Sequence, residues 1–263
     1  GSRALHVGVP LTADPTARPL FPAAPAAAWD DVLAGSCRVQ LPDDRIQHLF
    51  DAAMRTLVLH TPGDTYPGPY TYKRFWFRDA ALIANGLLCG NLTGLAERVF
   101  ARFFPRQRLD GYFHSQEGEW DSNGQVLWIL QQYRVLTGRP APAEWQAAVA
   151  HGADWLVRKR GQAAGELHNG LLPPGFSAEH LGNNDYYYWD DFWAWAGLLA
   201  ATELLQDGED MARARQYREQ ATAMGNAIEN SLSASRHIRA TDALPASPYR
   251  RMDAGAIGSL AAS

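Results

Sequence analysis

The stretch NNDYYYWDDFWAWAGLLAA, residues 183–201, combines two adjacent carboxylates with a dense aromatic and apolar run. From Phe192 onward the chain is apolar nearly all round a helical cylinder, which is typical of a helix enclosed by other helices. Asp190 and Asp191 stand just before this run. Burying a carboxylate is costly unless it is paired or neutralised. The two acids are therefore either solvated at a rim or have a chemical role.

Composition limits the classes of function. The chain has 263 residues, of which 46% are hydrophobic and 20% charged, so it can bury a sizeable core. A formal net charge of -4 and a pI of about 6.1 provide no broad positive field, which argues against nucleic acid and anionic membranes as partners and favours a neutral ligand. Cys37 and Cys89 are far apart in the sequence and provide neither a disulfide framework nor metal-ligand spacing. This use of cysteine favours a reducing cytoplasm, and neither a bilayer-spanning run nor a signal peptide is evident.

The pattern of apolar residues predicts an all-α protein. Residues 1–40 are rich in Ala and Pro and are expected to form an extended arm, and 41–263 a helical domain. Amphipathic helices are predicted from Asp43 and over 92–104, 144–158 and 209–233. More apolar helices alternate with them, over 75–89, over SNGQVLWILQQY (122–133), from Phe192, and from about Asp253. No alternating β-branched runs of strand type stand out.

The lengths of the connections indicate how these helices are arranged. Odd-to-even connections are long, at 61–74, 105–121, 161–189 and 236–252, whereas even-to-odd ones are short turns containing Gly90, Gly138 and Gly208. If successive helices run antiparallel, all the long loops emerge at the end where the apolar helices begin. The prediction is an α/α toroid of helical hairpins, with the apolar helices as its inner ring.

Polar motifs stand at the starts of the apolar helices: FWFRDAA (75–81), EGEWDSNGQ (117–125), YYYWDDFW (186–193) and YRRMDAG (249–255). In the predicted toroid they face one cavity. Helix N-termini carry partial positive charge, which offsets part of the cost of gathering carboxylates.

Three of these segments resemble the six-hairpin glycosidases, a superfamily with an (α/α)6 barrel that includes glucoamylases, trehalases and debranching glucosidases. The resemblance covers about residues 70–263. WFRDAALIA (76–84) is similar to the Trp-Pro-Arg-Asp segment of glucoamylases, which implies that Arg78 and Asp79 bind sugar hydroxyls. WDSNGQVLWIL (120–130) resembles their Asp-Gly segment, which implies that Trp120 and Asp121 line the sugar subsite.

YYWDDFWAWAGL (187–198) is similar in position to the Trp-Glu-Glu segment that bears the catalytic acid of glucoamylases. This implies that Asp190 or Asp191 protonates the leaving oxygen, although Asp in place of Glu shortens the reach. A second register is open, because PPGFSAEHLGNND (173–185) resembles the Asp-Glu loop of disaccharide phosphorylases and would make Glu179 the acid. The resemblance implies no metal and no organic cofactor.

The residue types also favour glycoside cleavage without reference to the resemblance. Glycoside cleavage requires one carboxyl held protonated and a second carboxylate that activates water or attacks the sugar. Aromatic burial and a like-charged neighbour both raise a carboxyl pKa, as at Asp190 beside Asp191. Indole and phenol rings stack on sugar faces. The candidate rings are Trp76, Trp120, Tyr188 and Trp189.

Each motif also has a structural interpretation. Arg78 and Asp79 could form an ion pair at a helix start, and Asp121 and Asp191 could cap helices. Phe192, Trp193 and Trp195 fit a core better than a sugar platform. Glu117 and Glu119 are expected to be solvated.

The predicted function is glycoside hydrolysis of an α-glucoside or similar small saccharide. The alternatives are a disaccharide phosphorylase, a non-catalytic saccharide-binding or scaffold toroid, and a polysaccharide lyase using residues such as Tyr188, His180, Arg250 and Arg251. A second carboxylate from a later hairpin is not evident. We therefore expect a fragment, a ring completed by another chain such as a second copy, or a shortened toroid that uses Glu117, Glu119 or Asp253.

Overall fold

The computed structural model describes residues 29–68, 70, 72–176, 184–239 and 244–250. The chain divides into two units, residues 1–36 and 37–263, and in the first the described part contains the short helix α1 (Trp29–Val32). Most of the predicted arm and the helix predicted from Asp253 lie outside the described residues. All that follows concerns the second unit. Its described residues are helical apart from loops and two isolated bridges, which confirms the all-α prediction.

Helix α2 (Asp44–Leu59) begins where the apolar spacing predicted. Asp43 is its N-cap, and the side chain accepts hydrogen bonds from the backbone N–H groups of Arg45 and Ile46, at 2.8 and 3.1 Å. Ile46 and Leu49, on the predicted apolar face, are nevertheless 55% and 66% exposed. The periodicity therefore located the helix without showing how much of its apolar face is covered.

The three apolar helices form an inner layer: α3 (Phe77–Cys89), α5 (Ser122–Thr137) and α7 (Tyr188–Asp207). Helix α5 packs against α3 on one side and α7 on the other. Helix α7 begins at Tyr188, four residues before the predicted Phe192, so Asp190 and Asp191 lie inside its first turn. The helix backbone therefore holds both acids in defined positions, which matters for their chemistry.

Two glycines allow α5 and α7 to touch backbone to backbone. A Cβ at Gly124 would lie 2.1 Å from the Trp193 carbonyl oxygen, and one at Gly197 would lie 2.6 Å from the Gly124 Cα. Any side chain here would force the two helices apart. This close contact fixes the spacing between the starts of α5 and α7.

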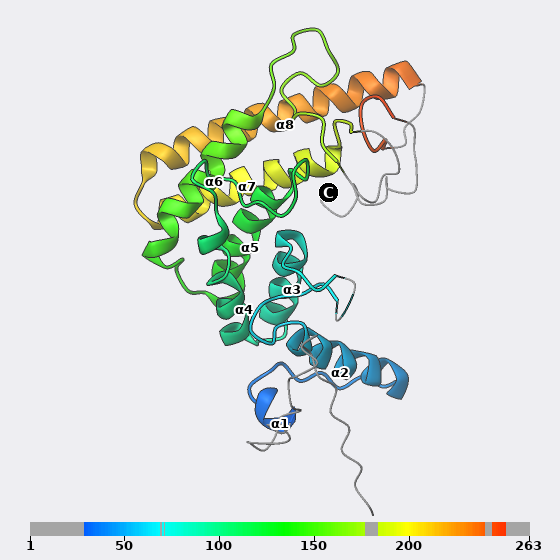
Figure 1. The fold of residues 1–263 in the computed structure, drawn as a ribbon, viewed down its shortest axis with the longest axis vertical. Coiled ribbons are helices and arrows are strands. Elements are labelled where there is room, and N and C mark those ends of the chain that lie inside the picture. Colours follow the sequence, from blue (N-terminus) through cyan, green and yellow to red (C-terminus); the bar gives the residue numbers. More distant parts are fainter. Residues whose placement is uncertain (1–28, 69, 71, 177–183, 240–243, 251–263) are drawn as a thin grey trace, which may run out of the picture. The chain divides into compact units, whose positions relative to one another are not determined.

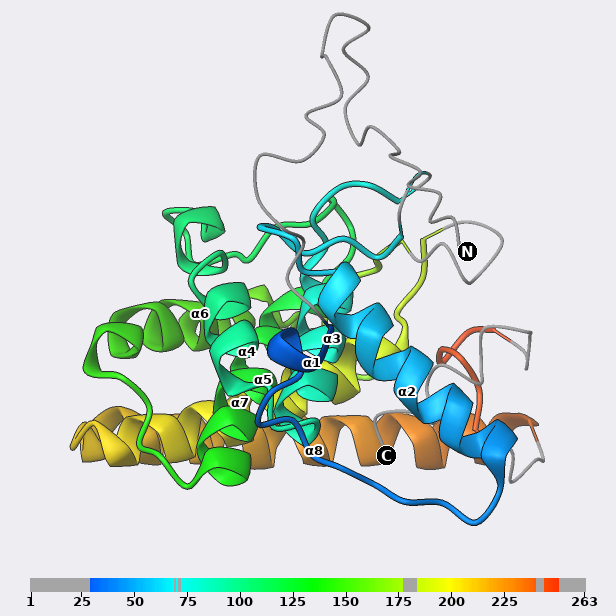
Figure 2. The ribbon, with the colours of Figure 1, turned by 90° about the horizontal axis from the view of Figure 1, so that it is seen from below.

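The amphipathic helices pack against this layer. Helix α4 (Thr93–Phe100) contacts α3, α6 (Gln146–Lys159) contacts α5 and α7, and α8 (Met211–Arg239) runs along α7 (Figure 1, Figure 2). Two short 3-10 helices, η1 (Phe104–Arg106) and η2 (Ala143–Trp145), lie in the connections. The prediction of one helix over 92–104 was too long, because the chain turns before Pro105, and α8 continues past the predicted Ser233.

The short connections end as predicted, with Gly90, Gly138 and Gly208 each at a helix C-cap. Gly138 alone of these three adopts the left-handed conformation, with φ 67°. After each apolar helix the chain turns here into an outer helix. The long connections lie at the opposite end, where the apolar helices begin. Within the described part of the chain, no helix has the length and apolarity needed to cross a membrane.

Candidate functional site

The starts of α3, α5 and α7 converge on the carboxylate of Asp121. Arg78, in the first turn of α3, donates from Nε to Asp121 Oδ2 at 2.7 Å. Trp189, in the first turn of α7, donates from Nε1 to the same oxygen at 2.8 Å. These partners are 43 and 68 residues from Asp121 in sequence. The structure thus brings together three motifs that the sequence placed at helix starts.

Asp121 is buried and rich in donors. A third hydrogen bond reaches Oδ2 from Gln125 Nε2, one turn along α5, at 3.1 Å. Three donors on one oxygen suit an ionised carboxylate, which only accepts. Asp121 occupies the N-cap position of α5 but makes no side-chain capping bond, so the capping interpretation of this residue is wrong.

Asp190 is buried beside this cluster and poor in donors. Its side chain is 4% exposed, and among the described residues no hydrogen bond reaches its carboxyl group. Burial raises the pKa of Asp190 well above its ordinary value, and the nearby charges of Asp121, Asp191 and Glu119 raise it further, whereas Arg78 opposes them. Asp190 lies within α7, so the helix backbone and the surrounding aromatic residues hold this acid in a fixed place.

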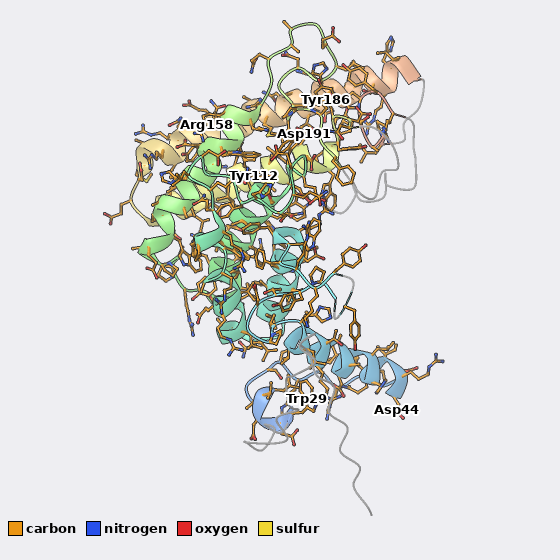
Figure 3. The ribbon with its side chains drawn as sticks, in the orientation of Figure 1. Trp29, Asp44, Tyr112, Arg158, Tyr186 and Asp191 are labelled. Atoms are coloured by element: carbon orange, nitrogen blue, oxygen red, sulfur yellow. The ribbon has the colours of Figure 1, made fainter. Side chains whose placement is uncertain are left out.

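Asp191 is completely buried, with 0% exposure, and its position in the first turn of α7 is marked in Figure 3. Oδ1 accepts a hydrogen bond from the Leu172 backbone N–H at 2.8 Å, and Oδ2 has no partner among the described residues. Burial raises its pKa to about 8, against the lowering effects of the Leu172 N–H and of Arg160. Asp191 lies inside the helix, so the capping interpretation is wrong here too. The Asp191 side chain therefore holds the backbone at Leu172, and its predicted catalytic role stays a prediction.

The two glutamates before α5 differ, although both were expected to be solvated. Glu117 is exposed, with loose contacts to Arg108 and His114 at 3.8 and 3.7 Å. Glu119 is 4% exposed and is one of the charges that raise the pKa of Asp190. The expectation is therefore wrong for Glu119. The intervening Gly118, with φ 90°, reverses the chain and turns the next side chain inward.

Tyr112 supports this turn. Its hydroxyl donates to the backbone carbonyls of Glu119, at 2.7 Å, and Gln116, at 3.0 Å. Burial raises the pKa of Tyr112, as do Asp121, Glu117 and Asp190, so the phenol stays protonated and acts as a donor. No pattern in the sequence indicates this contact, which joins residues with no shared motif.

Backbone hydrogen bonds of residues 175–176 join the starts of α5 and α7. The Phe176 N–H donates to the Gly118 carbonyl at 2.8 Å, and Gly175 exchanges backbone hydrogen bonds with Asp185 at 2.8 and 3.1 Å. A Cβ at Gly175 would lie 2.8 Å from the Trp120 ring. The glycine therefore lets this segment cover the indole closely.

Two residues predicted to touch a sugar are enclosed. Trp120 is 6% exposed, covered by Gly175, with Lys159 Nζ 3.7 Å from the centre of its ring. Tyr188 is fully buried, and its hydroxyl lies 2.7 Å from Ser231 Oγ on α8. Both side chains are buried in this structure, and the predicted sugar contacts of Trp120 and Tyr188 stay predictions.

The remaining predicted residues are less buried or lie outside the described part of the chain. Trp76, Asp79 and Trp189 are partly exposed, and the Arg74 guanidinium stands 3.8 Å above the Trp76 ring. Arg78, for which an ion pair with Asp79 was considered, forms an ion pair with Asp121. Glu179 and His180 lie outside the described residues.

Asp185 was not predicted as a functional or structural centre. Its Oδ2 accepts hydrogen bonds from Ser247 Oγ at 2.8 Å and from Arg250 Nε at 3.1 Å. The Ala246 carbonyl accepts a hydrogen bond from the Tyr188 N–H at 3.1 Å. Arg250, considered as a binder of uronate, is therefore engaged in holding residues 244–250 against the start of α7.

The structure contains two described hollows away from this cluster. One, of about 450 Å³, lies between α7 and α8 and includes Phe192 and Trp195 among its lining residues. The other, of about 520 Å³, lies between residues 160–170 and α8. Neither is lined by Asp121 or Asp190. The shared cavity expected at the acids stays a prediction.

No family model, curated protein or solved structure matches the chain. Among the residues that the structure describes, no group of three or more His, Cys, Asp or Glu side chains could hold a metal ion.

Proposed function

We propose that the protein is a glycoside hydrolase that cleaves an α-glucoside or a similar small saccharide. The observation that carries the proposal is a buried acid of raised pKa, Asp190, close to the buried carboxylates of Asp121 and Glu119. Hydrolysis needs one carboxyl that donates a proton and a second carboxylate that activates water or attacks the sugar. The site offers candidates for both roles beside the guanidinium of Arg78.

In the proposed reaction Asp190 is the general acid. Its proton passes to the glycosidic oxygen as the bond from that oxygen to the anomeric carbon breaks. Glu119, another buried carboxylate near Asp190, takes a proton from water while the water oxygen bonds to the anomeric carbon. This assigns the second carboxylate to a residue in the connection before α5.

Binding is assigned to the partly exposed groups around Asp121. The Arg78 guanidinium is planar and presents several donors, which suits neighbouring sugar hydroxyls. The indole of Trp189 is held by its bond to Asp121, so its ring is fixed in orientation before a sugar arrives. Trp76 and Asp79 complete the proposed binding set.

The helix arrangement supports the proposal. Three apolar helices lie side by side, each followed by a short turn and an outer helix, as in successive hairpins of an (α/α) toroid. The resemblance of WFRDAALIA and YYWDDFWAWAGL to six-hairpin glycosidases agrees with this order. We propose on these grounds that the unit is part of such a toroid.

The test is turnover on a panel of α-linked disaccharides and aryl α-glucosides, followed by proton NMR. Wild-type protein is expected to release the sugar, and Asp190→Asn and Glu119→Gln to bind it without releasing it. Glu117→Gln, a matched exposed control, should behave as wild type. Saccharide binding with no turnover by the wild type would contradict the proposal and favour a binding protein. Turnover only with inorganic phosphate would favour a phosphorylase.

A further inference from the structure

The two cysteines of the chain lie at a backbone contact between distant segments. Cys37 precedes α2 and Cys89 is the last residue of α3. The Cys37 N–H donates to the carbonyl of Gly90, the residue next to Cys89, at 2.9 Å. Widely separated positions in the sequence are thus neighbours in the structure.

This hydrogen bond limits the distance between the two residues. Standard bond lengths on either side of it place the Cα atoms of Cys37 and Cys89 within about 9 Å of each other. A disulfide needs roughly 4.4 to 6.8 Å between Cα atoms. A movement of Cys37 by a few Å, or none, is enough to bring the two cysteines within the distance that a disulfide needs.

The segment that would move is not helical. Residues 37–43 connect to α2, and within them the Leu41 N–H donates to Gln47 Oε1 at 3.0 Å. A shift of Cys37 therefore need not distort a helix. Both thiols are free, Cys89 is exposed, and Cys37 is half-buried, so a small oxidant can reach the first and the second can follow.

We propose that Cys37 and Cys89 are a redox modification site that closes to an intramolecular disulfide. The oxidant is a small disulfide such as oxidised glutathione. The Cys89 thiolate attacks it, which forms a mixed disulfide and releases one reduced thiol. The Cys37 thiolate then attacks the Cys89 sulfur, releases the second reduced thiol and completes the bond. Two protein thiols are oxidised and one small disulfide is reduced.

The bond would close a loop that contains all of α2. Ile46 and Leu49 show that this helix is incompletely covered, so a covalent tie at its start would restrain a weakly held element. Cys89 lies at the opposite end of α3 from Arg78, so the bond leaves the candidate site unchanged. The inference is independent of the proposed function.

The test uses the whole chain in glutathione redox buffers, with thiols trapped by alkylation and measured by intact mass and peptide mapping. We expect a monomer with a Cys37–Cys89 crosslink, no alkylatable thiol, and a midpoint of thermal unfolding raised by roughly 10 °C. Cys37→Ser and Cys89→Ser should each give one glutathione adduct and no rise. Two glutathione adducts on the wild type, or a disulfide-linked dimer, would overturn the inference.

Discussion

A buried acid lies at the start of each of α5 and α7, and the two acids have opposite surroundings. At the start of α5, Asp121 accepts hydrogen bonds from Arg78, Gln125 and Trp189. At the start of α7, the Asp190 carboxyl receives none from the described residues, and Asp121 itself is one of the charges that raise its pKa. Both are aspartates buried near a helix start, and they differ in the supply of hydrogen-bond donors.

This comparison divides the work of the site. A carboxylate with three donors is fixed in geometry and charge, which suits a group that organises binding. A buried acid without donors has a raised pKa, which suits proton transfer. The close contact of Gly124 and Gly197 fixes the spacing of the two helices and therefore this pairing.

The largest expected effect is on turnover. Asp190→Asn should lower kcat about 10²- to 10⁴-fold with little change in KM, since the general acid acts in the transition state. Asp121→Asn should mainly raise KM, because it disturbs Arg78 and Trp189. Steady-state kinetics on the substrate found in the panel separates the two. Equal losses in kcat for both variants would remove the division of roles.

Replacing Asp121 by alanine should destabilise the protein more than replacing it by asparagine. Asp121→Ala leaves Arg78, Gln125 and Trp189 without their shared acceptor and should lower the free energy of unfolding by about 3 kcal/mol. Asp121→Asn keeps an acceptor oxygen and should cost less. Urea unfolding of both variants checks this order, which would be wrong if the two lost the same amount.

The pH dependence of stability should depend on Asp191. Its pKa is raised from 3.8 to about 8, so the folded protein binds more protons than the unfolded one between these values. The stabilising contribution is complete below about pH 4 and is lost as pH rises towards 8. Asp191→Asn cannot ionise and keeps an acceptor for the Leu172 N–H. The free energy of unfolding of Asp191→Asn, relative to that of wild type, should therefore rise by about 2 to 5 kcal/mol between pH 5 and 8.

Chemical unfolding at several pH values measures this difference. Asp191→Ala serves as the second variant, because it also cannot ionise but loses the bond to Leu172, and it should be less stable than Asp191→Asn at every pH. A wild type and an Asp191→Asn variant whose stabilities change in parallel with pH would contradict the assignment.

The smallest expected effect concerns the indole bond. Trp189→Phe keeps an aromatic ring and removes the donor to Asp121, and should cost about 1 kcal/mol of stability. Glu117→Gln, at an exposed and loosely paired position, should change stability by less than about 0.5 kcal/mol. A thermal or urea midpoint for Trp189→Phe as close to wild type as that of Glu117→Gln would show that the bond contributes little.

The helices were predictable because each apolar stripe and each glycine turn is a local signal. The convergence of Arg78, Asp121 and Trp189 also followed from sequence, since long and short connections alternate. The choice between Asp190 and Asp191 did not, because one residue on a helix turns a side chain by about 100°. Only the packing of α7 shows that Asp191 faces Leu172.

Two other features depended on contacts that leave no pattern in the sequence. Glu119 is buried because Gly118 reverses the chain and Tyr112 holds its backbone, whereas the neighbouring Glu117 stays exposed. The rings of Trp120 and Tyr188 looked like sugar platforms, but Gly175 and Ser231 enclose them. Composition identifies aromatic residues and cannot identify what covers them.

The most direct test is a carbon-13 NMR titration of the aspartate carboxyl carbons, with Asp190 assigned from Asp190→Asn. We predict that Asp190 titrates well above the ordinary range of aspartate and that its pKa falls in Asp121→Asn, because a neighbouring negative charge is removed. An Asp190 signal that titrates in the ordinary range, or that does not move when Asp121 is neutralised, would contradict the account.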